Sequence, residues 1–307
     1  MKLAIIGAGH MGTLHAEKFA ACAGAKVVAV VDSDAARAQA LARKLGCRAS
    51  SDLREAISEA QAAVVAVPTE RHFEPAMACL QAGLHVLVEK PIAGSLEEAK
   101  QLIAAASGKN LLLQVGHVER YNLTFGALAS RMARPLFIEA ERLSGFKQRG
   151  ADVDVVLDLM IHDLDLAVSL SGSKVTEVSA SGFRVLTRDI DIANARIEFA
   201  NGCVANLSAS RVSQAPVRKL RVFQTDLYVS ADLQAGKLRY VRQIAGALES
   251  TEETREKGDA LAAQAHSFVE SVLKKEPAHV SGDDGLRALE LALEVGRMVR
   301  ERLERYG

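Results

Sequence analysis

The sequence contains no tryptophan, and phenylalanine and tyrosine bring its aromatic content to only 4% of 307 residues. With so few aromatic side chains, we do not expect a surface on which the bases of single-stranded nucleic acid stack. Lysine and arginine number 38, and aspartate and glutamate also number 38, so the formal net charge is zero. Without a net charge, no long-range field attracts nucleic acid or an anionic membrane.

Long apolar runs and paired cysteines are also lacking. Hydrophobic residues make up 49% of the chain, yet no uninterrupted run approaches the roughly 20 residues that span a bilayer. The N-terminal residues 3–6 are apolar after Lys2, but this stretch is too short for a secretion signal and predicts a first strand. The four cysteines are widely spaced and form no CxxC pair, which is typical of buried thiols in a reducing compartment. We therefore expect a cytoplasmic protein. The cysteines are Cys22, Cys47, Cys79 and Cys203.

The first 120 residues alternate short β-branched runs with amphipathic helical patterns. Such alternation predicts a doubly wound α/β domain, with a parallel sheet between helices. Gly46, Gly83 and Gly108 stand where three of the helices should end. The predicted strands are residues 3–6, 27–31, 63–67, 85–88 and 111–115, and the predicted helices are 11–21, 34–45, 70–82 and 96–106.

The pattern changes near residue 120 to strands that follow one another without helices. Asn201-Gly202 indicates a two-residue hairpin in which both turn residues have positive φ. We predict a second α+β domain with a mostly antiparallel sheet, and no Pro/Gly/Ser linker separates residues 1–120 from 121–307. The predicted strands are residues 135–144, 174–186, 190–199, 203–212, 219–225, 227–233 and 237–244, and the predicted helices are 154–170, 258–274 and 282–303.

A glycine-rich loop, residues 7–12, directly follows the first predicted strand and opens a helix. Gly7 permits a tight turn, Gly9 lets a pyrophosphate approach the backbone, and Gly12 allows close packing of helix and strand. The helix that starts near His10 and Met11 offers free N–H groups to the phosphates. This context predicts a dinucleotide site.

Asp32 ends the second predicted strand, 20 residues beyond Gly12. A carboxylate there accepts hydrogen bonds from the adenosine ribose and repels a 2′-phosphate, which favours NAD over NADP. Arg37 lies one helical turn away and is placed to stack on adenine or pair with a phosphate.

Glu89, Lys90 and Pro91 follow the predicted strand 85–88. The carboxyl ends of strands form the ligand crevice of a doubly wound sheet, so Lys90 is predicted to point toward the nicotinamide end of a cofactor. An ammonium there stabilises the alkoxide that develops as a hydride leaves. Taken alone, however, a lysine is more often a solvated surface residue.

A second group of ionisable residues interrupts the apolar helix 154–170. Asp158 and His162 are four residues apart and Asp165 extends their face, whereas Asp163 projects away from it. Histidine is suited to removing a proton from a secondary alcohol. The alternative is a histidine that is buried in the core with its hydrogen bonds made there and that takes no part in catalysis. No cysteine or further histidine lies at ligand spacing, so no metal site is predicted.

These features together resemble the glucose-fructose oxidoreductase/inositol dehydrogenase/MocA family. The resemblance rests on residues 7–12, 67–72, 82–91 and 157–165, and it covers nearly the whole chain. It implies a Rossmann domain followed by an open-faced α/β domain that commonly serves oligomerisation. It further implies that Lys90 and His162 flank the reacting carbinol, with Asp158 orienting either the substrate or His162. The residues that it places beside the cofactor are Val67, Pro68, Thr69 and His72.

Within that family, residues 116–122 and the stretch from Arg149 to residue 166 are most similar to the UDP-N-acetylglucosamine 3-dehydrogenases. That similarity implies oxidation of the sugar 3-hydroxyl, followed by a partner aminotransferase that makes a 3-amino sugar for lipid A. Leu123 and Gly145 stand where many relatives have proline, which leaves the local loop shape open. Candidates for binding the sugar or diphosphate are Arg120, Tyr121, Asn122 and Arg149, which ordinary polar packing would explain equally well.

The sequence thus predicts an NAD-dependent sugar dehydrogenase in which His162 takes the hydroxyl proton and Lys90 stabilises the alkoxide. Because the two residues would titrate as a coupled pair, the sequence leaves open which is the base. Three alternatives also remain open. They are a dehydrogenase of free polyols or aldoses, a transient oxidation that serves sugar cleavage, and a non-catalytic NAD-binding regulator, against which intact Lys90, Asp158 and His162 argue.

Overall fold

The computed structural model describes residues 1–146, 153–244 and 246–306, which form two compact units. The first unit comprises Met1–Val118 and Asp259–Leu286, and the second comprises Glu119–Gly258 and Arg287–Gly307. None of the helices in the described ranges is both long and apolar enough to cross a membrane.

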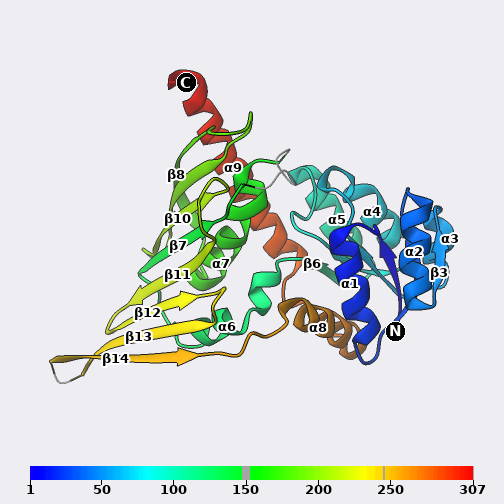
Figure 1. The fold of residues 1–307 in the computed structure, drawn as a ribbon, viewed down its shortest axis with the longest axis horizontal. Coiled ribbons are helices and arrows are strands. Elements are labelled where there is room, and N and C mark those ends of the chain that lie inside the picture. The colour runs from blue at the N-terminus through cyan, green and yellow to red at the C-terminus, as the bar shows by residue number, and fades with distance from the viewer. Residues whose placement is uncertain (147–152, 245, 307) are drawn as a thin grey trace. The chain divides into compact units, whose positions relative to one another are not determined.

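The first unit is built on a parallel sheet of six described strands in the order β3-β2-β1-β4-β5-β6. Figure 1 labels the two edge strands of this sheet, β3 and β6. This order reverses direction on either side of β1, which is the arrangement of a doubly wound dinucleotide-binding sheet. The predicted fold class is therefore confirmed. The strands are β1 (Lys2–Ile6), β2 (Lys26–Val31), β3 (Arg48–Ser50), β4 (Ala62–Val65), β5 (His85–Val88) and β6 (Leu113–Val115).

Helices cover both faces of this sheet because alternate strand residues point to opposite sides. Leu3 and Ile5 pack with residues of α1, α2 and α8, whereas Ala4 packs with Ala56 of α3 on the other face. The α2 helix begins where Asp34 accepts hydrogen bonds from two backbone amides, and it ends at Gly46 with a φ of 65°. The helices are α1 (His10–Ala21), α2 (Ala35–Leu45), α3 (Leu53–Ile57), η1 (Thr69–Arg71), α4 (Phe73–Gln81), α5 (Leu96–Gly108) and α8 (Ala260–Lys274).

The second unit contains eight described strands in the order β14-β13-β12-β11-β7-β10-β9-β8. All neighbours are antiparallel except β7 and β10, which confirms the mostly antiparallel sheet. The strands are β7 (Phe137–Leu143), β8 (Val175–Phe183), β9 (Ile192–Phe199), β10 (Val204–Ser210), β11 (Val217–Gln224), β12 (Leu227–Asp232), β13 (Lys237–Ile244) and β14 (Ala247–Thr254). The helices that lie wholly or mostly in this unit are η2 (Val118–Tyr121), α6 (Leu123–Ala129), η3 (Val156–Met160), α7 (Ile161–Ser171) and α9 (Gly282–Tyr306).

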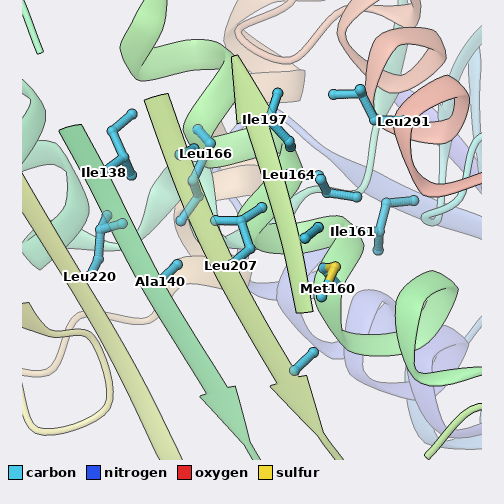
Figure 2. Close-up of a cluster of buried hydrophobic side chains, with 14 of the residues drawn as sticks. Ile138, Ala140, Met160, Ile161, Leu164, Leu166, Ile197, Leu207, Leu220 and Leu291 are labelled. Atoms are coloured by element: carbon cyan, nitrogen blue, oxygen red, sulfur yellow. The ribbon is translucent and has the colours of Figure 1, made fainter. Parts of the chain in front are cut away.

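One face of this second sheet packs on α7 and α9, whereas the described residues leave the other face open, as along β9, where alternate side chains are exposed or half-buried. In Figure 2, Met160, Ile161 and Leu164 lie against strands that carry Ile138 and Leu207. All five side chains are fully buried. This packing fixes the position of the helical segment that carries Asp158 and His162.

The hairpin predicted at Asn201-Gly202 is present, but its turn differs from the prediction. Gly202 N–H donates to the Phe199 carbonyl and Phe199 N–H to the Cys203 carbonyl, so the loop holds three residues rather than two. Gly202 has a φ of 84°, which suits the left-handed position that closes such a loop. Asn201 is held by its side chain, which donates a hydrogen bond to the Ser171 carbonyl and accepts one from Cys203 N–H.

Asp191 organises the loop between β8 and β9. Its buried carboxylate accepts hydrogen bonds from the backbone amides of Val185, Leu186 and Thr187 and from the Thr187 hydroxyl, at 2.7 to 2.8 Å. Burial alone would raise the pKa of Asp191, but the hydrogen bonds from Thr187, Val185 and Leu186 lower it to about 2. The folded protein therefore favours the charged form.

We expect Asp191→Asn to lower the free energy of unfolding by about 2 kcal/mol at pH 7. Since the folded pKa lies below the unfolded one, this stabilisation is fully present above about pH 4 and is lost as the pH falls toward about 2. Urea unfolding at several pH values measures it. Asp189→Asn, two residues away and exposed, is the matched control and should have little effect at any pH. A constant gap between wild type and Asp191→Asn from pH 7 to pH 2.5 would contradict this account.

Candidate active site

The segments that follow four parallel strands lie side by side at the carboxyl edge of the first sheet. Backbone hydrogen bonds of 2.7 to 2.9 Å run from Gly7 N–H to Val31, from Ala66 N–H to Ile6, and from Glu89 N–H to Val65. These bonds join the ends of β2, β1, β4 and β5 in their order in the sheet. The predicted crevice residues of this unit therefore belong to one continuous edge, where doubly wound folds bind ligands.

The glycine loop has the geometry that a dinucleotide pyrophosphate requires. Gly7 has a φ of 99°, and a Cβ on it would lie 2.6 Å from the Ala66 carbonyl oxygen. A Cβ on Gly12 would lie 1.8 Å from the Gly7 carbonyl oxygen, so both positions need glycine. A Cβ on Gly9, in contrast, would meet no described atom within 4 Å. The α1 helix starts at His10 with no side-chain cap from the described residues, which leaves its first N–H groups for an anion. The loop therefore fits a dinucleotide.

Asp32 closes the glycine loop from the end of β2. One carboxylate oxygen accepts from Ala8 N–H at 2.7 Å, and the other accepts from Asp34 N–H at 2.8 Å. Arg37 lies 3.3 Å from Asp32 and 3.1 Å from Asp34, with its side chain 56% exposed. Asp32 is thus fixed beside the loop, and Arg37 lies next to it with a guanidinium that still faces solvent.

The segment after β4 carries Val67, Pro68, Thr69 and His72. Val67 and Thr69 are half-buried and Pro68 is exposed, whereas His72 is fully buried. The His72 ring lies between two backbone carbonyl oxygens, with Nδ1 2.8 Å from Pro91 and Nε2 2.9 Å from Val67. Burial lowers the pKa of His72 despite both hydrogen bonds. The ring therefore joins the loop after β4 to the turn that follows Lys90.

Glu89 and Lys90 follow β5 directly. Lys90 is half-buried, and Glu89 is buried, with its carboxylate 2.6 Å from Nε2 of His15 on α1. Burial alone would raise the pKa of Glu89, but the hydrogen bond from His15 and the charges of His15 and Lys90 hold it below its usual range. The lysine ammonium therefore stands beside a buried carboxylate at the sheet edge.

In the second unit, Asp158 and His162 lie on either side of a change in helix type. Residues Val156–Met160 form a π-helical turn and α7 continues as an α-helix. Asp158 lies inside the π turn and His162 is the second residue of α7, and both are half-buried. The π turn departs from the regular four-residue spacing expected from the sequence. Such turns often occur at functional sites.

Arg142 of β7 anchors the helix that carries His162. Its guanidinium donates to both Asp163 carboxylate oxygens, at 2.8 and 2.9 Å, and to Glu119 at 2.9 Å. All three side chains are buried. Burial alone would lower the pKa of Arg142, but Asp163 and Glu119 outweigh it and raise the pKa. Asp163, the neighbour of His162, is thereby fixed to the sheet.

The predicted substrate-binding residues of the second unit have well-defined surroundings. Arg120 lies 3.6 Å from Asp165, and both side chains are almost fully buried. Asn122 is the N-cap of α6, accepting from Thr124 and Phe125 N–H and donating to the Leu233 carbonyl. Tyr121 is half-buried in η2. Arg149 lies outside the described residues.

The sequence interpretation missed His15 and Arg142, and it assigned no site role to Gly116 or Glu119 within residues 116–122. For Arg142 a signal was present, because it occupies the inward position of an alternating strand after Ile138 and Ala140, where a charge needs a buried partner. His15 carries no comparable local signal. Among the described residues, no three His, Cys, Asp and Glu side chains gather as metal ligands.

Comparisons with known proteins place both parts of the chain. Residues 1–117 match the family described as the oxidoreductase family with an NAD-binding Rossmann fold. Residues 127–229 match the GFO/IDH/MocA C-terminal domain.

Individual relatives are similar over nearly the full length. The chain is 38% identical to the UDP-N-acetylglucosamine 3-dehydrogenase of Acidithiobacillus ferrooxidans, with 99% of each chain covered. A solved structure of that enzyme has a TM-score of 0.93 and covers 97% of both chains. The inositol 2-dehydrogenase of Rhizobium meliloti is 27% identical, with 98% of each chain covered.

Proposed function

Since this chain belongs to the GFO/IDH/MocA oxidoreductase family and NAD is its cofactor, we propose that it oxidises the 3-hydroxyl of UDP-N-acetylglucosamine to a ketone. One observation carries the choice of substrate, namely the 38% identity over the whole chain to an enzyme of that name. The site residues support the same chemistry, because Lys90 follows β5 at the sheet edge and Asp158 and His162 flank the π-to-α junction.

Oxidation of a secondary alcohol breaks an O–H and a C–H bond and forms a carbonyl. Bound NAD supplies the acceptor for the hydride, at C4 of its nicotinamide. His162 accepts the hydroxyl proton, and Lys90 donates a hydrogen bond that stabilises the developing alkoxide. Asp158 orients His162 or the sugar. Arg142, through Asp163, limits the movement of the helix from which His162 acts.

The nucleotide part of the substrate needs cationic and polar partners. We propose that Tyr121 contacts the sugar and that Arg149 pairs with the diphosphate, for which a guanidinium is well suited. Arg120 and Asn122 are proposed to shape this region through Asp165 and the start of α6. The open face of the second sheet is proposed to form a homo-oligomer contact, and an aminotransferase in the cytoplasm is proposed to consume the ketone.

The direct test is NADH absorbance at equal concentrations of UDP-N-acetylglucosamine, myo-inositol and glucose, with a carbonyl trap because the oxidation is uphill. We expect NADH and a trapped ketone with the nucleotide sugar only. Turnover of inositol or glucose alone would instead favour the free-polyol alternative, to which the similarity with inositol 2-dehydrogenases points.

Asp32 is expected to set the cofactor preference. Asp32→Ala removes the carboxylate that repels a 2′-phosphate, and it removes one of the two carboxylates that hold Arg37, which can then pair with the phosphate. We expect the ratio of kcat/KM for NAD to that for NADP to fall by about 10²-fold, which corresponds to about 3 kcal/mol. Glu59→Ala, which removes an exposed carboxylate of the same unit and leaves Asp32 and Arg37 in place, is the control for the loss of one negative charge. An unchanged ratio in Asp32→Ala would show that the preference arises elsewhere.

A further inference from the structure

Glu89, which precedes Lys90, is enclosed from several elements of the first unit. Its backbone N–H donates to Val65 of β4, and one carboxylate oxygen accepts from the backbone N–H of Lys90 at 3.2 Å. Gly116 lies against its other side, where a Cβ would be 3.0 Å from the Glu89 Cα and Oε1. A larger residue at position 116 would therefore push the carboxylate out of place.

His15 holds the second carboxylate oxygen of Glu89. The two side chains are 74 residues apart in sequence, and Nε2 of His15 donates across 2.6 Å to Oε1. The His15 side chain is fully buried and packs beside Phe19, which in turn contacts Phe268 of α8. His15 therefore has little room to move, and through it the Glu89 carboxylate is fixed to α1.

The α1 helix is also the helix whose N-terminus follows the glycine loop. His15 lies three residues beyond Gly12, so a single short helical segment joins the phosphate-binding end to the contact with Glu89. Loss of this contact would let the turn at Lys90 shift relative to α1. Displacement by about 1 Å at a reacting group costs up to about 10²-fold in rate.

We propose that His15 and Glu89 are positioning residues, which fix the turn carrying Lys90 to the cofactor-binding helix so that the ammonium keeps one place at the reacting oxygen. This role rests on the proposed function, because Lys90 is the group being placed. This positioning role also differs from core packing, because it requires a hydrogen-bond donor at the position that Nε2 of His15 occupies. A glutamine amide offers such a donor and leucine does not.

The test compares His15→Leu and His15→Gln with wild type, and uses His266→Leu, an exposed histidine on α8, as the matched control. We expect His15→Leu to lower kcat by about 10- to 100-fold with unchanged NAD affinity and unchanged KM for the sugar. His15→Gln should recover most of kcat, and His266→Leu should match wild type. The proposal is wrong if His15→Leu has a lower melting temperature but keeps the wild-type kcat. It is also wrong if the kcat of His15→Gln is as low as that of His15→Leu.

A second readout needs no substrate. Amide hydrogen exchange in the peptide containing Lys90 reports the bond from its N–H to Glu89, and it should speed up in His15→Leu and Glu89→Gln but not in His266→Leu. Unchanged protection would overturn the proposal. If wild type oxidises no sugar while exchange changes as expected, the proposed function fails and the anchoring of the Lys90 turn by His15 stands.

Discussion

Replacement of Lys90 by methionine is expected to lower kcat by about 10²- to 10³-fold, the usual cost of removing one donor to a developing oxyanion. Lys90 follows β5 at the carboxyl edge of the parallel sheet, and it is half-buried beside the Glu89 carboxylate. Methionine keeps much of the length of the side chain but cannot donate a hydrogen bond. Steady-state kinetics with UDP-N-acetylglucosamine and NAD, together with a separate titration of NAD binding, measure the effect.

The binding titration should show unchanged NAD affinity, because the glycine loop and Asp32 remain intact. Lys100→Met, an exposed lysine on α5 of the same unit, is the matched control and should retain full activity. Lys90→Arg should recover little of the wild-type kcat, because a planar guanidinium cannot occupy the place of a compact ammonium. A kcat of Lys90→Met within tenfold of the wild-type value would show that Lys90 does not stabilise the alkoxide.

Arg142→Met is expected to have the largest effect on stability, lowering the free energy of unfolding by about 3 to 5 kcal/mol. The reason is that it leaves the Asp163 carboxylate buried without the arginine that holds it, and it leaves Glu119 with Arg218 but without Arg142. Burial alone would raise the pKa of Glu119, but Arg142 and Arg218 hold it below its usual range, so the loss of one arginine leaves a charged side chain poorly compensated. Urea unfolding followed by circular dichroism measures the change.

Arg221→Met is a close control for this variant. Arg221 lies on the adjacent strand β11 and also bridges two carboxylates, Glu139 and Glu141, at 3.4 and 3.5 Å, but about a third of each side chain is exposed. We therefore expect it to cost less than about 1 kcal/mol. The double variant Arg142→Met/Asp163→Leu should recover part of the lost stability, because it also removes the buried carboxylate that Arg142 had neutralised. Equal losses for Arg142→Met and Arg221→Met would refute the role assigned to the buried network.

Local patterns in the sequence predicted much of the fold. Alternating strands and helices, together with glycines such as Gly46 at helix ends, gave the parallel sheet and its class. The short β3 strand and α3 were missed because three to five residues carry too little periodicity to detect. The β14 strand was missed because its residues Ala247–Thr254 are nearly all exposed and rich in glutamate, so no apolar alternation marks it. No local signal indicates that α8 packs in the first unit.

The candidate site could be predicted only where a motif has a fixed structural context. The glycines, Asp32 and Lys90 lie at strand ends of a familiar sheet, so their places follow from the order of elements. Arg120 and Asn122 stay predicted ligand contacts, but their partners Asp165 and Leu233 could not be deduced from one sequence, because these contacts join distant positions. The same limit hid the contact of His15 with Glu89, which joins residues 74 positions apart.

Oxidation at the 3-hydroxyl is measured most directly by following the hydride that leaves C3 of the sugar. Enzyme and NAD are incubated with UDP-N-acetylglucosamine that carries deuterium at C3, and the reduced cofactor is analysed by mass spectrometry and proton NMR. We expect NADH with one deuterium at nicotinamide C4 from the C3-labelled sugar and none from sugar labelled at C4. Unlabelled NADH from the C3-labelled sugar, or deuterium transferred from C4, would contradict oxidation at the 3-hydroxyl.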